Sequence, residues 1–196
     1  MIFMPILDIF LLRPQAVIHA CENRRAPLWI SAFIILIGVT YGLLVALLQR
    51  SLGGKLQDIP VADIPFWVLV LGNVLPGILI TIMVHIGAML VAWLMAKAVG
   101  GPGLLALLYR ATGYLLPLSL PALPAIAFTG AMTTITAAPA AGSMPLLYQV
   151  LAILGAALFL AGLYQVFRIT QNCQPARALL AVALFAAFSV SILSLA

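Results

Sequence analysis

Charged side chains are scarce in this sequence. Its 196 residues include only nine Lys or Arg and four Asp or Glu, whereas 65% of the residues are apolar. A soluble domain carries about 25% charged residues, and a mean hydropathy of +1.26 leaves too little polar surface to cover a protein of this size in water. These deficits exclude a soluble globular domain and a disordered chain, and they predict an integral membrane protein.

Runs of basic residues are missing as well. Lys and Arg stand singly or in pairs, without the cluster of about four to eight that grips phosphate or acidic lipid. We therefore expect no nucleic-acid partner, and the partner that the composition predicts is the lipid bilayer. The sequence has two cysteines, Cys21 and Cys173. Both fall on the side that the charge distribution assigns to the reducing cytoplasm, where no structural disulfide is expected.

Five long apolar stretches predict an all-α, five-span transmembrane helix bundle. A spanning helix needs about 20 apolar residues, and no repeat or linker divides the chain, so we expect one membrane domain over residues 1–196. A cytoplasmic or interfacial segment is expected at residues 1–27. The expected spans then cover residues 28–48, 77–98, 113–134, 145–167 and 176–196.

The second stretch, residues 66–98, is longer than one crossing requires. Within it, Asn73 to Gly77 (NVLPG) indicates a break, because proline and glycine both disfavour helix continuation. We therefore take residues 77–98 as the span. Phe66–Pro76 remains open as an interfacial segment, a re-entrant segment or part of a long kinked helix.

The third stretch contains three prolines, Pro117, Pro121 and Pro124. Each proline removes a backbone donor, and a carbonyl left without a partner in hydrocarbon must be satisfied by neighbouring groups. We therefore expect this span to be kinked and mostly surrounded by protein.

Lys and Arg gather on alternate connections of the predicted bundle. Seven basic residues fall on one side of the predicted spans: Arg13, Arg24, Arg25, Lys97, Arg110, Arg168 and Arg177. The connections on the other side hold only Arg50 and Lys55. Because short cytoplasmic loops carry an excess of Lys and Arg, the count predicts a cytoplasmic N-terminus and an external C-terminus. An odd number of spans follows.

Small and polar residues recur at helical spacing in three predicted spans. Such stripes are typical of helix packing in membranes, where small residues allow backbones to approach closely. At about 100° per residue, the residues expected to pack are Gly38 and Gly42 in the first span, Ala88 and Ala92 with Thr81 and His85 in the second, and Ala183 and Ala187 in the last.

His85 is an ionisable residue inside a predicted span, which makes it a functional hypothesis by default. Together with Thr81 it is a candidate for proton transfer or ligand contact. No Asp or Glu lies in any predicted span, so a carboxylate–histidine relay cannot be assembled. The alternative is a neutral imidazole hydrogen-bonded to a neighbouring helix.

The sequence offers no constellation for catalysis. It shows neither a nucleophile–base pair at plausible depth nor a metal-ligand spacing. We therefore predict no catalytic residue, no metal site and no cofactor, and we expect that the protein is not an enzyme.

The connection after the second span carries two short motifs. KAVGGPG at residues 97–103 is followed by a short amphipathic stretch and by ATGYLLP at residues 111–117. This order resembles the Yip family of polytopic membrane proteins. In that family a Gly-Gly turn, an amphipathic stretch and a Gly-Tyr pair before a proline-containing span recur in this order. APLWI at 26–30 and RALLA at 177–181 are similar to the entries of its first and last spans. The residues that carry the family motif are Gly100, Gly101, Gly113, Tyr114 and Pro117.

The resemblance covers residues 5–196 and implies five spans with a cytoplasmic N-terminus. Eukaryotic Yip proteins bind Rab-type GTPases and form complexes with one another. This sequence lacks their long cytosolic N-terminal region and has Arg24-Arg25-Ala26 in place of an acidic-aromatic motif. Both departures weaken the expectation of GTPase binding, and both suit the shorter bacterial members.

We therefore expect a non-enzymatic scaffold or interaction protein in membrane organisation, forming homo- or hetero-oligomers with membrane proteins. The short N-terminus favours a bacterial plasma membrane over an endomembrane. The alternative is a small transporter or channel-forming subunit that uses the His85 face and the proline-broken third span.

Overall fold

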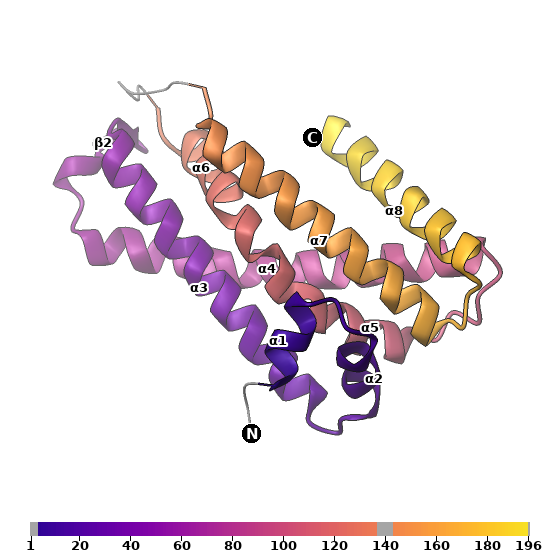
Figure 1. The fold of residues 1–196 in the computed structure, drawn as a ribbon. Helices are drawn as coiled ribbons and strands as arrows, with labels where there is room; N and C mark the ends of the chain where they lie inside the picture. Colours follow the sequence, from indigo (N-terminus) through magenta and orange to yellow (C-terminus); the bar gives the residue numbers. More distant parts are fainter. Residues whose placement is uncertain (1–3, 137–142, 196) are drawn as a thin grey trace. The chain divides into compact units, whose positions relative to one another are not determined.

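The computed structural model describes residues 4–136 and 143–195, which form an all-α structure apart from one short hairpin (Figure 1). Its elements are α1 (Met4–Phe10), α2 (Pro14–Glu22), α3 (Ala26–Leu52), β1 (Lys55–Leu56), β2 (Ile59–Pro60), η1 (Val61–Asp63), α4 (Phe66–Ala98), α5 (Leu105–Leu115), η2 (Leu116–Ala122), α6 (Leu123–Thr134), α7 (Leu146–Thr170) and α8 (Pro175–Leu195).

Four helical segments in the described residues are long and apolar enough to cross a membrane: Ala26–Leu52, Phe66–Ala98, Leu105–Thr134 and Leu146–Thr170. The shorter α8 is apolar over Pro175–Ser191, and its 21 residues match the length of one crossing. The prediction of an all-α membrane-spanning bundle is confirmed, and five spans are consistent with these lengths. The ends of the first, fourth and fifth expected spans differ from those of the helices by a few residues.

The predicted break in the second apolar stretch is wrong. α4 runs without interruption for 33 residues, and Pro76 lies inside it. Of the three possibilities for Phe66–Pro76, the long helix is the correct one. A proline inside a membrane helix is tolerated because the remaining backbone bonds and neighbouring segments stabilise the helix. Gly77, part of the supposed break, is instead a packing residue, since a Cβ on it would lie 2.6 Å from the Gly38 carbonyl oxygen.

The third apolar stretch begins earlier than predicted, at Leu105 instead of residue 113, because α5 already belongs to it. The helix then tightens into the 3-10 segment η2, which contains Pro121, before α6 resumes an α-helix. A 3-10 turn bonds each amide to the carbonyl three residues earlier, which suits a sequence whose prolines interrupt the α-helical pattern. The expected irregularity of this span therefore takes the form of a 3-10 segment.

The chain folds as two compact units, and α3, α4 and α7 contribute to both. The first unit comprises the described parts of Met1–Phe33, Met83–Leu118 and Ala157–Ala196. The second comprises Ile34–Ile82 and the described parts of Ser119–Ala156. The expectation of one membrane domain over residues 1–196 stays a prediction.

In the second unit, α3 and α4 approach to backbone contact. A Cβ on Gly38 would lie 2.5 Å from the Cα of Ile78, and a Cβ on Gly42 would lie 2.5 Å from the Cα of Val74. Only glycine allows two helices to come this close. The G-x-x-x-G pair of the first span therefore lies at an internal helix contact.

The connection after α3 is fixed by the side chain of Arg50. Its Nη1 donates to the backbone oxygens of Val61, Ala62 and Ile64 at 2.8, 3.0 and 3.2 Å. The hairpin of β1 and β2 pairs Lys55 with Pro60. Lys55 also exchanges backbone hydrogen bonds with Thr136, which follows α6. This ordered connection belongs to the second unit.

Ala183 and Ala187 of the last span, which were expected to pack, do not pack against another helix within the described part of the chain. Ala183 and Ala187 are exposed, whereas α8 buries Ala178, Ala181 and Phe185. The ring of Phe185 packs on Phe159 of α7, with the ring centroids 6.2 Å apart. An aromatic side chain buries far more apolar area than a row of alanines, so the face of α8 that carries Phe185 packs inward.

The N-terminal residues form two short helices in the first unit. Leu12, with a φ of 53°, lies between them, and Pro14 is the first residue of α2. α2 contacts α5 and buries Ala16, Val17 and Ala20. The described part of the expected interfacial segment is therefore largely helical.

Candidate functional site

The Gly-Gly turn of the family motif caps the end of α4. The Gly100 amide donates to the oxygen of Lys97, and the Gly101 amide donates to the oxygen of Ala96, at 3.0 and 2.8 Å. With a Gly100 φ of +80°, this is the Schellman arrangement, in which a left-handed residue lets the chain satisfy the last helical carbonyls. Glycine is favoured there because its φ is positive.

The rest of this turn is held by one side chain of α4 itself and by one that follows α7. The indole Nε1 of Trp93 donates to the oxygen of Gly103 at 3.1 Å. The amides of Gly103 and Leu104 donate to Oε1 of Gln171 at 2.8 and 3.3 Å. Gln171 itself is buried, with 2% of its surface exposed. The connection between α4 and α5 is therefore fixed on the end of α7. The sequence analysis did not identify Trp93 or Gln171 as residues of this site.

Gly113 and Tyr114 of the motif pack against the beginning of α3. A Cβ on Gly113 would lie 2.6 Å from Cγ1 of the buried Ile30. The Tyr114 ring meets Phe33 edge-on, with centroids 5.9 Å apart, and its hydroxyl accepts a 3.4 Å hydrogen bond from Asn23. Pro117 is buried in η2. These motif residues therefore build the contact between α5 and the N-terminal part of the chain.

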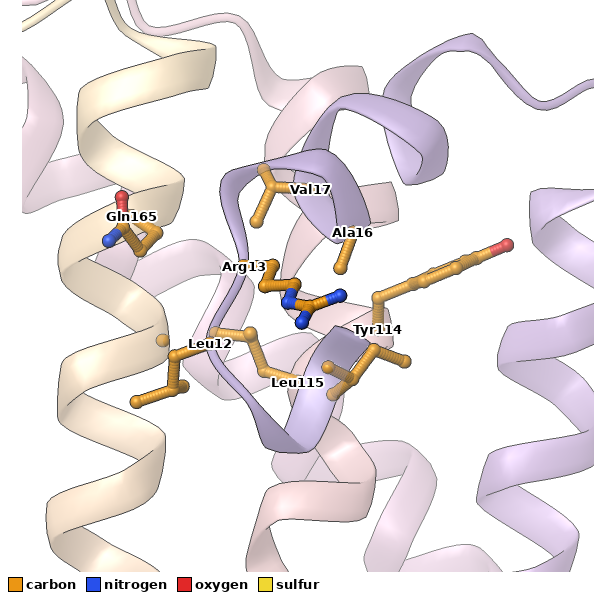
Figure 2. A pocket seen from close by; sticks show the side chains of 9 residues that line it. Leu12, Arg13, Ala16, Val17, Tyr114, Leu115 and Gln165 are labelled. Atoms are coloured by element: carbon orange, nitrogen blue, oxygen red, sulfur yellow. The ribbon is translucent and has the colours of Figure 1, made fainter. Parts of the chain in front are cut away.

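A small cavity lies beside this contact, at the corner between α1 and α2. Figure 2 shows Arg13, Ala16 and Val17 of the corner around Tyr114 and Leu115 of α5. Its volume is about 10 Å³, which is space for about one water molecule. Nη1 of Arg13 is paired with Oδ1 of Asp8 at 2.9 Å. The corner is thus a packing defect and too small for an organic ligand.

His85 is buried in the first unit with 2% of its surface exposed. Its ring lies against Tyr109 of α5, with centroids 5.0 Å apart. Neither Nδ1 nor Nε2 has a hydrogen-bond partner among the described residues. The structure therefore does not supply the hydrogen bond that the alternative interpretation of His85 requires.

The other residues of the predicted stripe on α4 have ordinary roles. Thr81 is buried and donates from Oγ1 to the Gly77 oxygen at 2.8 Å, within its own helix. Ala92 is fully buried and Ala88 is half-buried. The stripe thus faces protein, and only the imidazole of His85 lacks a partner in the described residues.

Sequence reasoning missed a chain of polar side chains in the second unit. Nδ2 of Asn73 on α4 donates to Oε1 of Gln49 on α3 at 2.9 Å, and Nε2 of Gln49 donates to Oγ1 of Thr134 on α6 at 2.8 Å. Gln49 is 1% exposed. The sequence predicts a break at Asn73, and Gln49 lies just outside the expected first span. A carboxamide beside or within an apolar run was the available signal, because such groups hydrogen-bond across membrane helices.

The described residues contain no group of three His, Cys, Asp or Glu side chains that would hold a metal ion. The two thiols are those of Cys21, half-buried, and Cys173, buried. Burial raises the pKa of both thiols, and the nearby guanidinium groups of Arg110 and Arg177 oppose that rise for Cys21 and Cys173 respectively. Neither thiol has the lowered pKa that marks a reactive cysteine.

Comparison of the chain with protein-family models, with curated proteins and with solved structures finds no match. The resemblance to the Yip family therefore rests on the motif residues themselves.

Proposed function

We propose that this chain is a non-enzymatic, Yip-type integral membrane protein that acts as a scaffold or interaction partner in membrane organisation. The observation that carries the proposal is the outward face of α8. Ala183 and Ala187 are exposed one helical turn apart on an apolar helix. Small residues on a membrane helix allow a second helix to approach closely, so this face suits association with another copy or another membrane protein.

The use of the other polar groups supports the same proposal. Gln49, Asn73 and Thr134 hydrogen-bond to one another, Gln171 holds the turn after α4, and Thr81 bonds within its helix. These groups tie helices and turns together. A protein whose polar side chains mainly fix its own architecture is better suited to present surfaces than to perform chemistry.

Crosslinking in native membranes tests the proposal. In a chain with Cys21→Ser and Cys173→Ser, Ala183→Cys should form a covalent dimer or a crosslink to a discrete partner under mild oxidation. Phe188→Cys, another exposed position on α8, is the matched control and should crosslink much less. If neither the Ala183→Cys variant nor the Phe188→Cys variant formed a crosslinked species, the result would contradict the scaffold role.

We also propose a bacterial plasma membrane with the N-terminus in the cytoplasm and the C-terminus outside. The distribution of Lys and Arg supports this orientation, since seven of nine lie on one side of five crossings. Arg24-Arg25-Ala26, where eukaryotic Yip proteins have an acidic-aromatic motif, argues against binding of a Rab-type GTPase.

A small transporter or channel subunit is the second candidate, and His85 is the observation that favours it. A buried imidazole with two unpartnered nitrogens is costly, and intramembrane histidines often mark a proton or solute path. His85→Leu separates the two functions. The scaffold proposal expects unchanged crosslinking and phenotype, whereas loss of function with normal expression and assembly would favour transport.

A further inference from the structure

A groove of about 420 Å³ lies in the second unit, at the end where α3 passes into the hairpin. This volume is within the range of about 300–1,000 Å³ typical of sites for small organic ligands. The first helical turns of α4 and the hairpin form its walls. The groove is lined by Gln49, Leu56, Gln57, Ile59, Ile64, Val68, Leu69, Gly72, Asn73 and Thr134.

On the helical wall of the groove, Asn73 and Gln49 together leave one acceptor and one donor unused by the described residues, and the hairpin adds the carboxamide of Gln57. Both hydrogens of Asn73 Nδ2 are used, by Gln49 Oε1 at 2.9 Å and by the Leu69 oxygen at 2.7 Å, and within the described residues no donor reaches Asn73 Oδ1. Nε2 of Gln49 donates one hydrogen to Oγ1 of Thr134, and its second hydrogen is not used by any described residue. A hydroxyl group both donates and accepts, so it matches this pair of free positions.

None of the ten lining residues is charged. Arg50, the nearest cation along α3, is already engaged with three backbone oxygens. A charged ligand group buried against these residues would find no counter-ion among them, which disfavours a charge in the groove. The lining therefore selects an uncharged head.

Five lining residues are aliphatic, namely Leu56, Ile59, Ile64, Val68 and Leu69. The charged residues of the adjacent connection indicate the depth of the groove in the membrane. Arg50 lies in the last turn of α3, and Lys55, Asp58 and Asp63 lie between the end of α3 and the start of α4. Charged side chains of this kind belong in the headgroup region. A ligand at this level can place its head in the groove and its chain along Val68 and the exposed Leu71 and Leu75 of α4.

The hairpin that closes the groove has an unusual backbone. Gln57 and Asp58 both have positive φ, 50° and 68°, as the two central residues of a type I′ turn require. Neither is glycine, so the turn costs some strain. This turn places Leu56, Gln57 and Ile59 on the groove.

We propose that the groove binds the hydroxyl-bearing head of an uncharged lipid, of the monoacylglycerol class. The head bonds to Oδ1 of Asn73 and Nε2 of Gln49, while the aliphatic chain runs along α4. This role is additional to the scaffold function and does not depend on the surface of α8.

Photo-crosslinking in proteoliposomes tests the proposal, with a diazirine-bearing monoacylglycerol as the probe. Labelling is mapped by peptide mass spectrometry and competed with monooleoylglycerol, oleate or glycerol. We expect saturable labelling of residues 56–72 that monooleoylglycerol removes and oleate or glycerol does not. Competition by glycerol alone would assign the groove to a free polyol and overturn the lipid assignment. Equal competition by oleate, or labelling spread evenly over all helices, would also overturn the proposal.

Two glycines of α4 provide a matched pair of variants. A Cβ on Gly72 or on Gly87 would meet no atom within 4 Å, so both accept a larger side chain, but only Gly72 lines the groove. Gly72→Leu should abolish groove labelling and Gly87→Leu should leave it unchanged, with similar melting temperatures. Asn73→Leu should weaken binding about fivefold through the loss of one hydrogen bond. Equal labelling of the Gly72 and Gly87 variants, or unaltered affinity of Asn73→Leu, would contradict the site.

Discussion

Gly38 of α3 lies directly against Ile78 of α4. A Cβ on Gly38 would be 2.5 Å from the Ile78 Cα and 2.7 Å from its amide nitrogen. These are backbone atoms and cannot rotate aside as the tip of a side chain would. Because lipid and aliphatic side chains are equally apolar, such close packing is a main source of attraction between membrane helices.

Replacement of Gly38 by a larger residue should therefore separate α3 from α4. Gly38→Leu is expected to lower the free energy of unfolding by about 1–3 kcal/mol, measured as loss of structure in mild detergent against increasing SDS. Gly87→Leu is the control, since Gly87 is exposed with open space around its Cβ position. Its stability should be unchanged or higher by up to about 1 kcal/mol, because leucine is the better helix former. Equal losses in both variants would argue against the close approach.

The Asn73–Gln49 hydrogen bond predicts energetic coupling between two residues that sequence reasoning did not connect. A double-mutant cycle with Asn73→Leu and Gln49→Leu should give a coupling energy of about 0.6 kcal/mol, and up to about 1.7 kcal/mol. Gln149 offers the control because it is exposed and donates instead to the Met144 oxygen. Gln49→Leu and Gln149→Leu should be additive. Additivity in the Asn73 cycle as well would show that the polar chain does not form.

The cap of α4 predicts a difference between two substitutions of the same glycine. Gly100 has a φ of +80°, where a β-branched residue is strained and asparagine is tolerated. Gly100→Val should cost about 1–2 kcal/mol, and Gly100→Asn clearly less, measured by thermal unfolding in detergent. If valine and asparagine had the same effect, the left-handed cap would be absent.

The environment of Cys21 predicts how its alkylation depends on pH. Burial raises the pKa of the thiol, and the Arg110 guanidinium partly offsets this rise. Because the thiolate is the nucleophile, the alkylation rate of the folded chain should reach half its maximum at a higher pH than that of the unfolded chain. Arg110→Gln should move this midpoint to still higher pH, in a Cys173→Ser background. The exposed Arg24 is the control, and a shift with Arg24→Gln but not with Arg110→Gln would contradict the arrangement.

The composition and the five apolar runs were sufficient to predict an all-α membrane protein, because only helices or closed barrels satisfy the backbone in lipid. Local patterns also identified Gly38 and Gly42, whose spacing places both on one helix face. The length of α4 could not be read in the same way. Whether Pro76 ends a helix depends on its neighbours, and here Gly77 packs against α3.

The candidate sites could not be predicted from local patterns, because they bring together residues that are far apart in the sequence. The carboxamides of Gln49 and Asn73 are 24 residues apart, and Gln171 is 68 residues from Gly103. The inward face of α8 was misjudged because it depends on Phe159 of α7, which receives the ring of Phe185. Spacing along one helix cannot identify such a partner.

The number of crossings is most directly tested with reporters at the two ends. An N-terminal fluorescent protein, which matures only in the cytoplasm, should be bright, and alkaline phosphatase fused after Ala196, which is active only outside it, should be active. This result requires an odd number of spans, as α3, α4, the Leu105–Thr134 segment, α7 and α8 provide. A bright N-terminal reporter together with inactive phosphatase after Ala196 would contradict five crossings and the orientation drawn from them.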